Sequence, residues 1–272
     1  MTAQTITGRV GRPVPVKPVR IQHVIHSEWV KISTLRSTWY VLVATVIGMV
    51  GIGAIAAAVG AAHWGSMSAA NRATFSAVDT SLTGVALAQM IISVLGVLLV
   101  TGEYSTGMIR SSLSAVPRRL KMLAAKLVVA GALSVAVSVA GGIVALLVGK
   151  ALLGSHGALD GSDAVRSLLG SAFYLMSITV FAGAVGFIVR STAGGIAAVL
   201  GLLLVLPVLG AVLPQSWQNE LLPFLPTNAG NAAYAMHPYD NSLSAGAGFV
   251  TLCVWMVVAS VTAALLLRKR DA

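Results

Sequence analysis

The sequence predicts an all-α membrane protein with six transmembrane helices. Its 272 residues are 57% hydrophobic and only 10% charged, whereas soluble domains carry roughly 25% charged residues. A transmembrane helix needs about 20 mostly apolar residues, and six such runs follow one another along the chain. We expect these spans at residues 39–62, 81–101, 122–149, 167–189, 193–213 and 246–267.

The net charge of +10 is explained by membrane topology. Six spans place both termini on one side, and 15 of the 18 Lys and Arg residues then fall on that same side. The other side holds Arg72, Lys150 and Arg166. Because loops rich in Lys and Arg stay inside the cell, we expect cytoplasmic termini. A nucleic-acid partner is not expected, since no soluble segment is long enough to present a basic face.

The residues before the first span divide into two parts. Residues 1–20 hold three prolines among basic residues, and prolines prevent a continuous helix, so we expect a disordered cytoplasmic tail. Residues 21–38 carry apolar side chains at helical spacing, which predicts an amphipathic helix lying in the membrane interface. Residues 39–267 then form the transmembrane domain, and 268–272 form a second cytoplasmic tail. The candidate functional residues of this interfacial helix are Glu28, Trp29, Lys31 and Arg36.

The sequence contains no enzyme motif. Gly149 and Lys150 end a glycine-containing stretch, but the glycine spacing and the following Ser or Thr of a phosphate-binding loop are missing. Cys253, the only cysteine, lies within an apolar run, so neither a disulfide framework nor a thiolate metal site is expected. Ionisable residues are nearly absent from the centres of the spans, which disfavours an ion-coupled carrier. We therefore expect no catalytic residues, no metal and no cofactor bound by this chain.

Residues 102–121 form the largest loop between two spans on the basic side. Apolar residues recur there at intervals of three and four, and Pro117 stands where a new helix can begin because its missing N–H costs nothing. We expect a short helix, a break and a second helix that enters the third span. An ordinary basic loop, held by its positive charge alone, remains the alternative.

Two stretches carry a resemblance to a known family. GEYSTGMIRSSLSAVPRRLKMLAAKL begins at Gly102, and LLPFLPTNAG covers residues 221–230. Both resemble the membrane subunit of ABC-2 type transporters, which have the type V ABC exporter fold, and in particular the actinobacterial permeases. The resemblance covers about residues 21–270. It departs from the family pattern at Thr106 and Met108, where His and Thr are commoner.

The resemblance implies an architecture and a set of partners. The interfacial helix becomes the elbow helix, the loop after the second span carries a coupling helix, and short re-entrant external helices lie between the last two spans. A transporter of two permeases, identical or different, is energised by two separate ABC ATPase subunits that bind ATP and Mg²⁺. The expected contacts with the ATPase are Glu103, Tyr104, Gly107, Ile109, Arg110 and Ser111. Neither Glu103 nor Arg110 is expected to be needed to hold the spans together.

The sequence predicts the transported compound only as a chemical class. Polar but uncharged residues within the spans suit the export of a drug, an amphiphile or a lipid-linked compound across a bacterial cell membrane. The candidate cavity-lining residues are Gln89, Ser93, Tyr174 and Ser177. Alternatively, these side chains form hydrogen bonds with neighbouring helices. A passive channel or a structural membrane protein remains the alternative to a transporter, with an intramembrane enzyme as a third class.

Overall fold

In a computed structural model, the chain is described at residues 20–109, 111, 119–210, 212–238 and 241–269, and this part is almost entirely helical. Six helical segments are long and apolar enough to cross a membrane, which confirms the number of spans expected from the sequence. They are Arg36–Ala62, Ala77–Ser105, Arg119–His156, Gly161–Val189, Thr192–Gly210 and Ala245–Lys269.

Several spans consist of more than one helical element, and shorter helices connect them. The elements are α1 (Ile21–Thr34), α2 (Arg36–Ala62), η1 (Trp64–Ser66), α3 (Ala69–Ala73), α4 (Ala77–Leu82), α5 (Val85–Ser105), α7 (Arg119–Leu153), η2 (Gly154–His156), α8 (Gly161–Val189), α9 (Thr192–Leu200), η3 (Gly201–Val205), α10 (Leu206–Gly210), α11 (Gln215–Leu221), η4 (Leu222–Phe224), α12 (Pro226–Tyr234) and α13 (Ala245–Lys269).

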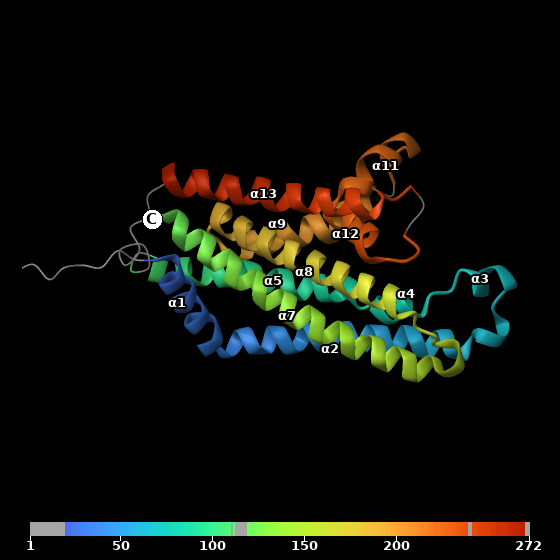
Figure 1. Cartoon of the computed structure of the whole chain (residues 1–272). Helices are drawn as coiled ribbons and strands as arrows, with labels where there is room; N and C mark the ends of the chain where they lie inside the picture. The colour runs from blue at the N-terminus through green and yellow to red at the C-terminus, as the bar shows by residue number, and fades with distance from the viewer. Residues whose placement is uncertain (1–19, 110, 112–118, 211, 239–240, 270–272) are drawn as a thin grey trace, which may run out of the picture.

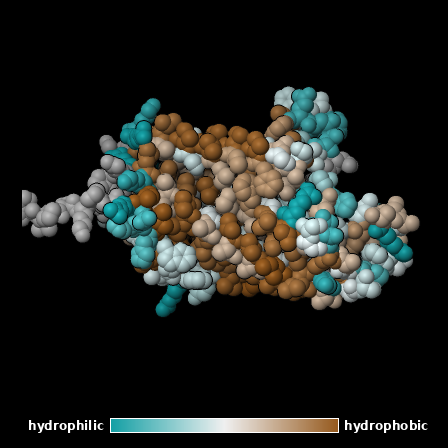
Figure 2. Space-filling view, in the orientation of Figure 1, coloured by the Kyte–Doolittle hydropathy of each residue, from teal (hydrophilic) through white to brown (hydrophobic). Residues whose placement is uncertain are grey.

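The spans run side by side along one axis, with the short elements at the two ends (Figure 1). We call the end that carries α1 and the last residues of α5 and α13 the α1 end, and the opposite end, with α3 and α11, the α11 end. The guanidinium of Arg119 donates to the carbonyl oxygen of Leu267 at 3.0 Å, so the start of α7 lies beside the last turn of α13. An apolar band lies between two hydrophilic ends (Figure 2).

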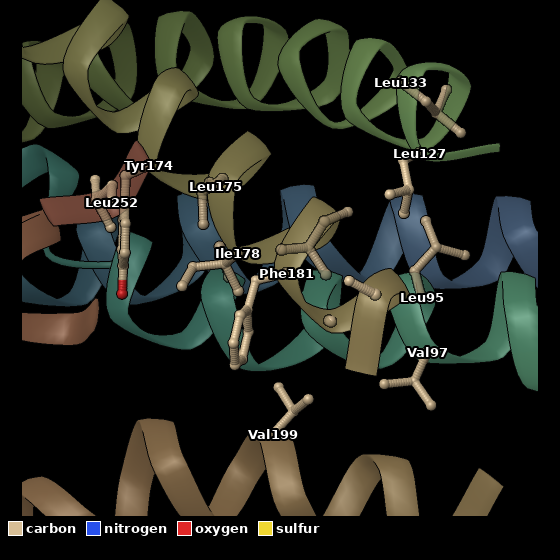
Figure 3. Close-up of a cluster of buried hydrophobic side chains, with 14 of the residues drawn as sticks. Leu95, Val97, Leu127, Leu133, Tyr174, Leu175, Ile178, Phe181, Val199 and Leu252 are labelled. Carbon is tan, nitrogen blue, oxygen red and sulfur yellow. The ribbon is translucent and has the colours of Figure 1, made fainter. Parts of the chain in front are cut away.

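Helices α5 and α8 form the centre of the bundle, since 56% and 67% of the most apolar stretch of their spans is buried inside the protein. Tyr174, Ile178 and Phe181 of α8 lie in one buried cluster with α5, α9 and α13 side chains (Figure 3). The outer helices α2 and α13 instead expose large apolar side chains, among them Ile47 at 65% and Val250 at 63%. Such faces are suited to contact with lipid or with another membrane helix.

The junction of α1 and α2 lies earlier than the sequence suggested. Leu35 has extended backbone angles between the two helices, and α2 begins at Arg36, three residues before the expected start of the first span. The inner face of α1 buries Val24, Glu28 and Ile32, which are four residues apart. A carboxylate thus lies on the buried face between two apolar side chains.

The fifth span is distorted at a proline, and α12 compensates for the distortion. Pro207 has no N–H to donate to the carbonyl oxygen of Leu203, four residues earlier. Residues Gly201–Val205 adopt a π-helical turn, and the hydroxyl of Thr227 in α12 donates to the Leu203 oxygen at 3.0 Å. An acceptor that proline leaves without its usual donor is therefore satisfied by the loop between the last two spans.

This loop contains two short helices, α11 and α12, and α12 is largely buried against α8 and α13. Small residues permit that burial: a Cβ on Gly170 would lie 2.7 Å from the Ala233 oxygen, and one on Gly248 would lie 2.5 Å from the Ala229 oxygen. Beyond α12, the carboxylate of Asp79 in α4 accepts hydrogen bonds from the backbone N–H groups of Met236 and His237 at 2.8 and 2.9 Å. With the hydrogen bond from Thr227 to the fifth span, the loop is therefore tied to four of the spans.

The close contact between α2 and α4 generates a prediction. A Cβ on Gly53 would lie 2.2 Å from the backbone oxygen of Ser81, whereas one on Gly51, in the same helix, would have no atom within 4 Å. Because overpacking costs about 1–3 kcal/mol, Gly53→Ala should lower the thermal unfolding midpoint in detergent. Gly51→Ala should leave that midpoint unchanged or raise it. Equal midpoints for the two variants would contradict this packing.

Candidate functional site

Four charged side chains meet at the α1 end, and we call Glu28, Lys31, Glu103 and Lys126 the charge cluster. The Lys126 ammonium lies 2.5 Å from Glu28 Oε2 and 2.9 Å from Glu103 Oε1. The Lys31 ammonium lies 2.7 Å from Glu28 Oε1 and 3.1 Å from Glu103 Oε1. The cluster joins three helices, since Glu28 and Lys31 belong to α1, Glu103 to α5 and Lys126 to α7.

Most of the charge cluster is shielded from solvent. Glu28, Glu103 and Lys126 are 1%, 4% and 2% exposed, while the side chain of Lys31 is 31% exposed. Burying an unpaired charge costs several kcal/mol, whereas paired and hydrogen-bonded charges offset that cost. Two carboxylates and two ammonium groups balance here, so each buried charge has an opposite charge within hydrogen-bonding distance.

The pKa of Lys31 reflects these surroundings. Its partial burial lowers the pKa, but the hydrogen bond to Glu28 and the charge of Glu103 outweigh burial, so the pKa is raised above its ordinary value. A raised pKa in the folded state means that the ammonium form stabilises the fold. This contribution is fully present below the ordinary lysine pKa of about 10.4. It is lost only as the pH rises through the higher pKa of the folded state.

The residues that sequence analysis assigned to the ATPase contact are divided by the structure. The expectation that Glu103 is not needed to hold the spans together is wrong, because its carboxylate pairs with Lys126 of α7 and Lys31 of α1. The ring of Tyr104 also faces the protein, with the Arg190 guanidinium carbon 5.4 Å from its centroid. Ile109 is only 4% exposed.

The remaining residues of this set lie nearer the surface. Gly107 has a φ of 71°, in the left-handed region that glycine adopts easily, and it lies two residues after the end of α5. Ser111 is exposed, and its hydroxyl donates to the Met108 oxygen at 2.8 Å. Arg110 and Pro117 lie outside the described residues. The expected short helix after α5 is seen only at positions 108, 109 and 111, which are helical.

The residues expected on the interfacial helix also point in different directions. Glu28 faces inward and Lys31 is half-buried, whereas Trp29 is 46% exposed. Arg36 is exposed at the first position of α2. This helix therefore has one face on the protein, through Glu28, while Trp29 presents an aromatic side chain outward.

The four candidate cavity residues are buried within the helical bundle. The hydroxyl of Tyr174 donates to Gln89 Oε1, which joins α8 to α5. The hydroxyls of Ser93 and Ser177 donate to backbone oxygens of their own helices, those of Met90 and Phe173. All four are at most 2% exposed. The pair of Gln89 and Tyr174 matches the alternative of hydrogen bonds with neighbouring helices, whereas Ser93 and Ser177 bond within their own helices.

Sequence analysis missed the role of Lys126, which it counted only as a basic residue near the membrane surface. A signal was available: only three of the eight acidic residues fall on the basic side, and Glu28 and Glu103 are two of them. Acidic residues at the ends of apolar segments need partners. Among the described residues, no three His, Cys, Asp or Glu side chains are grouped in a way that could hold a metal ion.

Comparison with protein families supports the resemblance. The family model described as "ABC-2 family transporter protein" matches residues 24–210. The chain belongs to the ABC-2 transporter family. The matched region runs from α1 to the end of α10 and contains the whole charge cluster. No curated protein matches the sequence. An ABC-2 permease is the multi-pass membrane component of an ABC transporter, and membership of the family implies association with an ABC ATPase.

The charge cluster of this permease generates a second prediction. Lys126→Met leaves Glu28 and Glu103 without their most buried partner, and breaking a buried ion pair costs about 3–5 kcal/mol. The variant should therefore unfold at a clearly lower temperature than the wild type in detergent. Lys150→Met is the matched control, because Lys150 is an exposed residue of the same helix and its removal should change the midpoint little.

A combined variant separates pairing from a general loss of packing. If the two charges act together, Lys126→Met with Glu103→Gln should destabilise less than the sum of the two single changes, with a coupling of about 0.5–3 kcal/mol. Strict additivity, or a Lys126→Met midpoint equal to that of the control, would contradict the assigned role.

Proposed function

We propose that this chain is the permease subunit of an ABC exporter and that a separate ATPase supplies its energy. The observation that carries the proposal is the charge cluster, which lies within the region matched by the family and joins α1, α5 and α7 beside the loop after α5. In a permease without its own nucleotide site, ATP and Mg²⁺ are bound by the ATPase. The loop after α5 is the segment through which force enters.

The charge cluster gives this loop a rigid connection to the spans. Pairs between Lys126 and the two carboxylates link α7 to both α1 and α5, and Arg190, which follows α8, stacks on Tyr104 at the end of α5. A push on the loop therefore moves α5 and α7 together rather than bending one of them. Rigid-body movement of packed helices is a common route of conformational change in proteins.

The surface offered to the ATPase consists of the exposed residues after α5. Ser105, Thr106, Gly107, Met108 and Ser111 are exposed. Glu103 and Tyr104 support this surface from behind instead of contacting the partner. The surface lies at the α1 end, and an ATPase reaches it if that end faces the cytoplasm, as the distribution of Lys and Arg predicts.

Two further features are assigned by the same proposal. Helix α12, covered by α8 and α13, lies between the last two spans and closes the α11 end of the transport path, since non-spanning backbone within a membrane must be covered by protein. The apolar outer faces of α2 and α13 provide surface for a second permease and for lipid. Drugs, amphiphiles and lipid-linked compounds fit a transporter of this largely apolar kind.

A charge placed on the surface offered to the ATPase, which we call the docking surface, tests the proposal. Ser111→Glu introduces a carboxylate beside the ATPase contact and should weaken the association about tenfold, which corresponds to 1.4 kcal/mol. The measurement is the amount of ABC ATPase that co-purifies with the permease, together with ATP hydrolysis by the reconstituted complex. Ser216→Glu makes the same change on exposed α11 at the opposite end and should have no effect. Equal loss, or no loss, in both variants would contradict the assigned docking surface.

A further inference from the structure

A cavity of about 490 Å³ lies next to the charge cluster, within the range of about 300–1,000 Å³ found for ligand sites. The junction of α1 and α2 forms one wall through Ile32 and Leu35, and the last turns of α5 form the other through Leu95, Leu98 and Leu99. Most of the exposed wall is therefore apolar. The cavity belongs to the α1 end, where the apolar band meets hydrophilic surface (Figure 2).

The polar part of the same wall is concentrated in a few residues. Lys31, Glu103 and Lys126 line the cavity, as do the hydroxyl-bearing residues Thr38 and Thr106. An apolar wall with a small number of polar groups is the usual composition of a site for an amphiphile. At the border of an apolar band, the corresponding ligand is a lipid with its head group at the polar residues and its chain along the leucines.

One atom of the charge cluster identifies the chemistry of the head group. Glu103 Oε1 accepts from both Lys31 and Lys126, but Oε2 is buried and takes no hydrogen bond from any described residue. A buried acceptor without a donor destabilises the fold. A ligand that donates a hydrogen bond to Oε2 removes this destabilisation.

The charge balance of the cluster decides between charged and uncharged donors. Among the described residues, two carboxylates already face two ammonium groups, so a cationic head group would add positive charge and an anionic one would place negative charge beside Glu103. Either would bring a net charge into a poorly solvated site. An uncharged hydroxyl donates to Oε2 without disturbing the balance.

We propose that this cavity binds a membrane lipid with an uncharged, hydroxyl-bearing head group. A hydroxyl of the lipid donates to Glu103 Oε2, and the acyl chain lies along Leu95, Leu98 and Leu99. The bound lipid contacts α1, α2 and α5 at once and stabilises the α1 end of the permease. The proposal rests on the geometry of the chain alone and does not depend on its partner or on transport.

Photo-crosslinking of the full-length permease, without ATPase or nucleotide, tests the site. The probe is a monoacylglycerol with a diazirine in its acyl chain, and labelled peptides are identified by mass spectrometry. Label is expected in residues 31–38 and 95–108, and excess unlabelled monoacylglycerol should remove it. Two further probes carry the same chain: the dimethyl ether, which has no hydroxyl donor, and the free fatty acid, which is anionic. Both should label these peptides about tenfold less, equivalent to 1.4 kcal/mol.

Leu98→Trp fills the cavity and leaves the four charged residues in place, so labelling by the monoacylglycerol should fall about tenfold, again equivalent to 1.4 kcal/mol. Leu147→Trp is the control, because Leu147 is 61% exposed on α7 and does not line the cavity. Equal labelling by the three probes, label elsewhere in the chain, or unchanged labelling of Leu98→Trp would overturn the proposal. If Leu98→Trp does not fold, the probe comparison and the competition on the wild-type chain decide it.

Discussion

The buried ammonium of Lys126 is the constraint on which the α1 end of this permease depends. A lysine that is 2% exposed is stable as a cation only if carboxylates surround it, and the two available come from α1 and α5. The requirement to pair one charge therefore fixes the positions of three helices relative to one another. Glu28 explains why α1 presents a polar residue on its inner face, and Glu103 explains why α5 extends beyond its apolar run.

The opposite end is organised by a different requirement, the satisfaction of backbone groups. Pro207 leaves the Leu203 oxygen without its usual helical donor, and Thr227 supplies a hydrogen bond to it. Small residues let α12 lie against α8 and α13, so the loop between the last two spans is integrated into the bundle. The α1 end of the permease is therefore held together by ion pairs, and the α11 end by close packing of helices.

The sequence predicted the six spans correctly because each is an apolar run about as long as a bilayer is thick. It did not predict the charge cluster, since Lys126 is 98 residues from Glu28 and 23 from Glu103, and such pairs depend on how helices pack. The sequence assigned Glu103 to an external contact, whereas the structure buries its carboxylate in the charge cluster. The uncharged polar residues were ambiguous for the same reason: Gln89 and Tyr174 meet only when α5 packs on α8.

Hydrogen exchange of α1 in the Lys126→Met permease tests this account most directly. If the charge cluster holds α1 against the bundle, the amides of residues 21–34 should lose protection in the variant by about the 3–5 kcal/mol expected for a broken buried ion pair. The amides of α8, which lie outside the cluster, should keep theirs. Unchanged protection of α1, or an equal loss in both helices, would contradict the claim that Lys126 holds α1 in place.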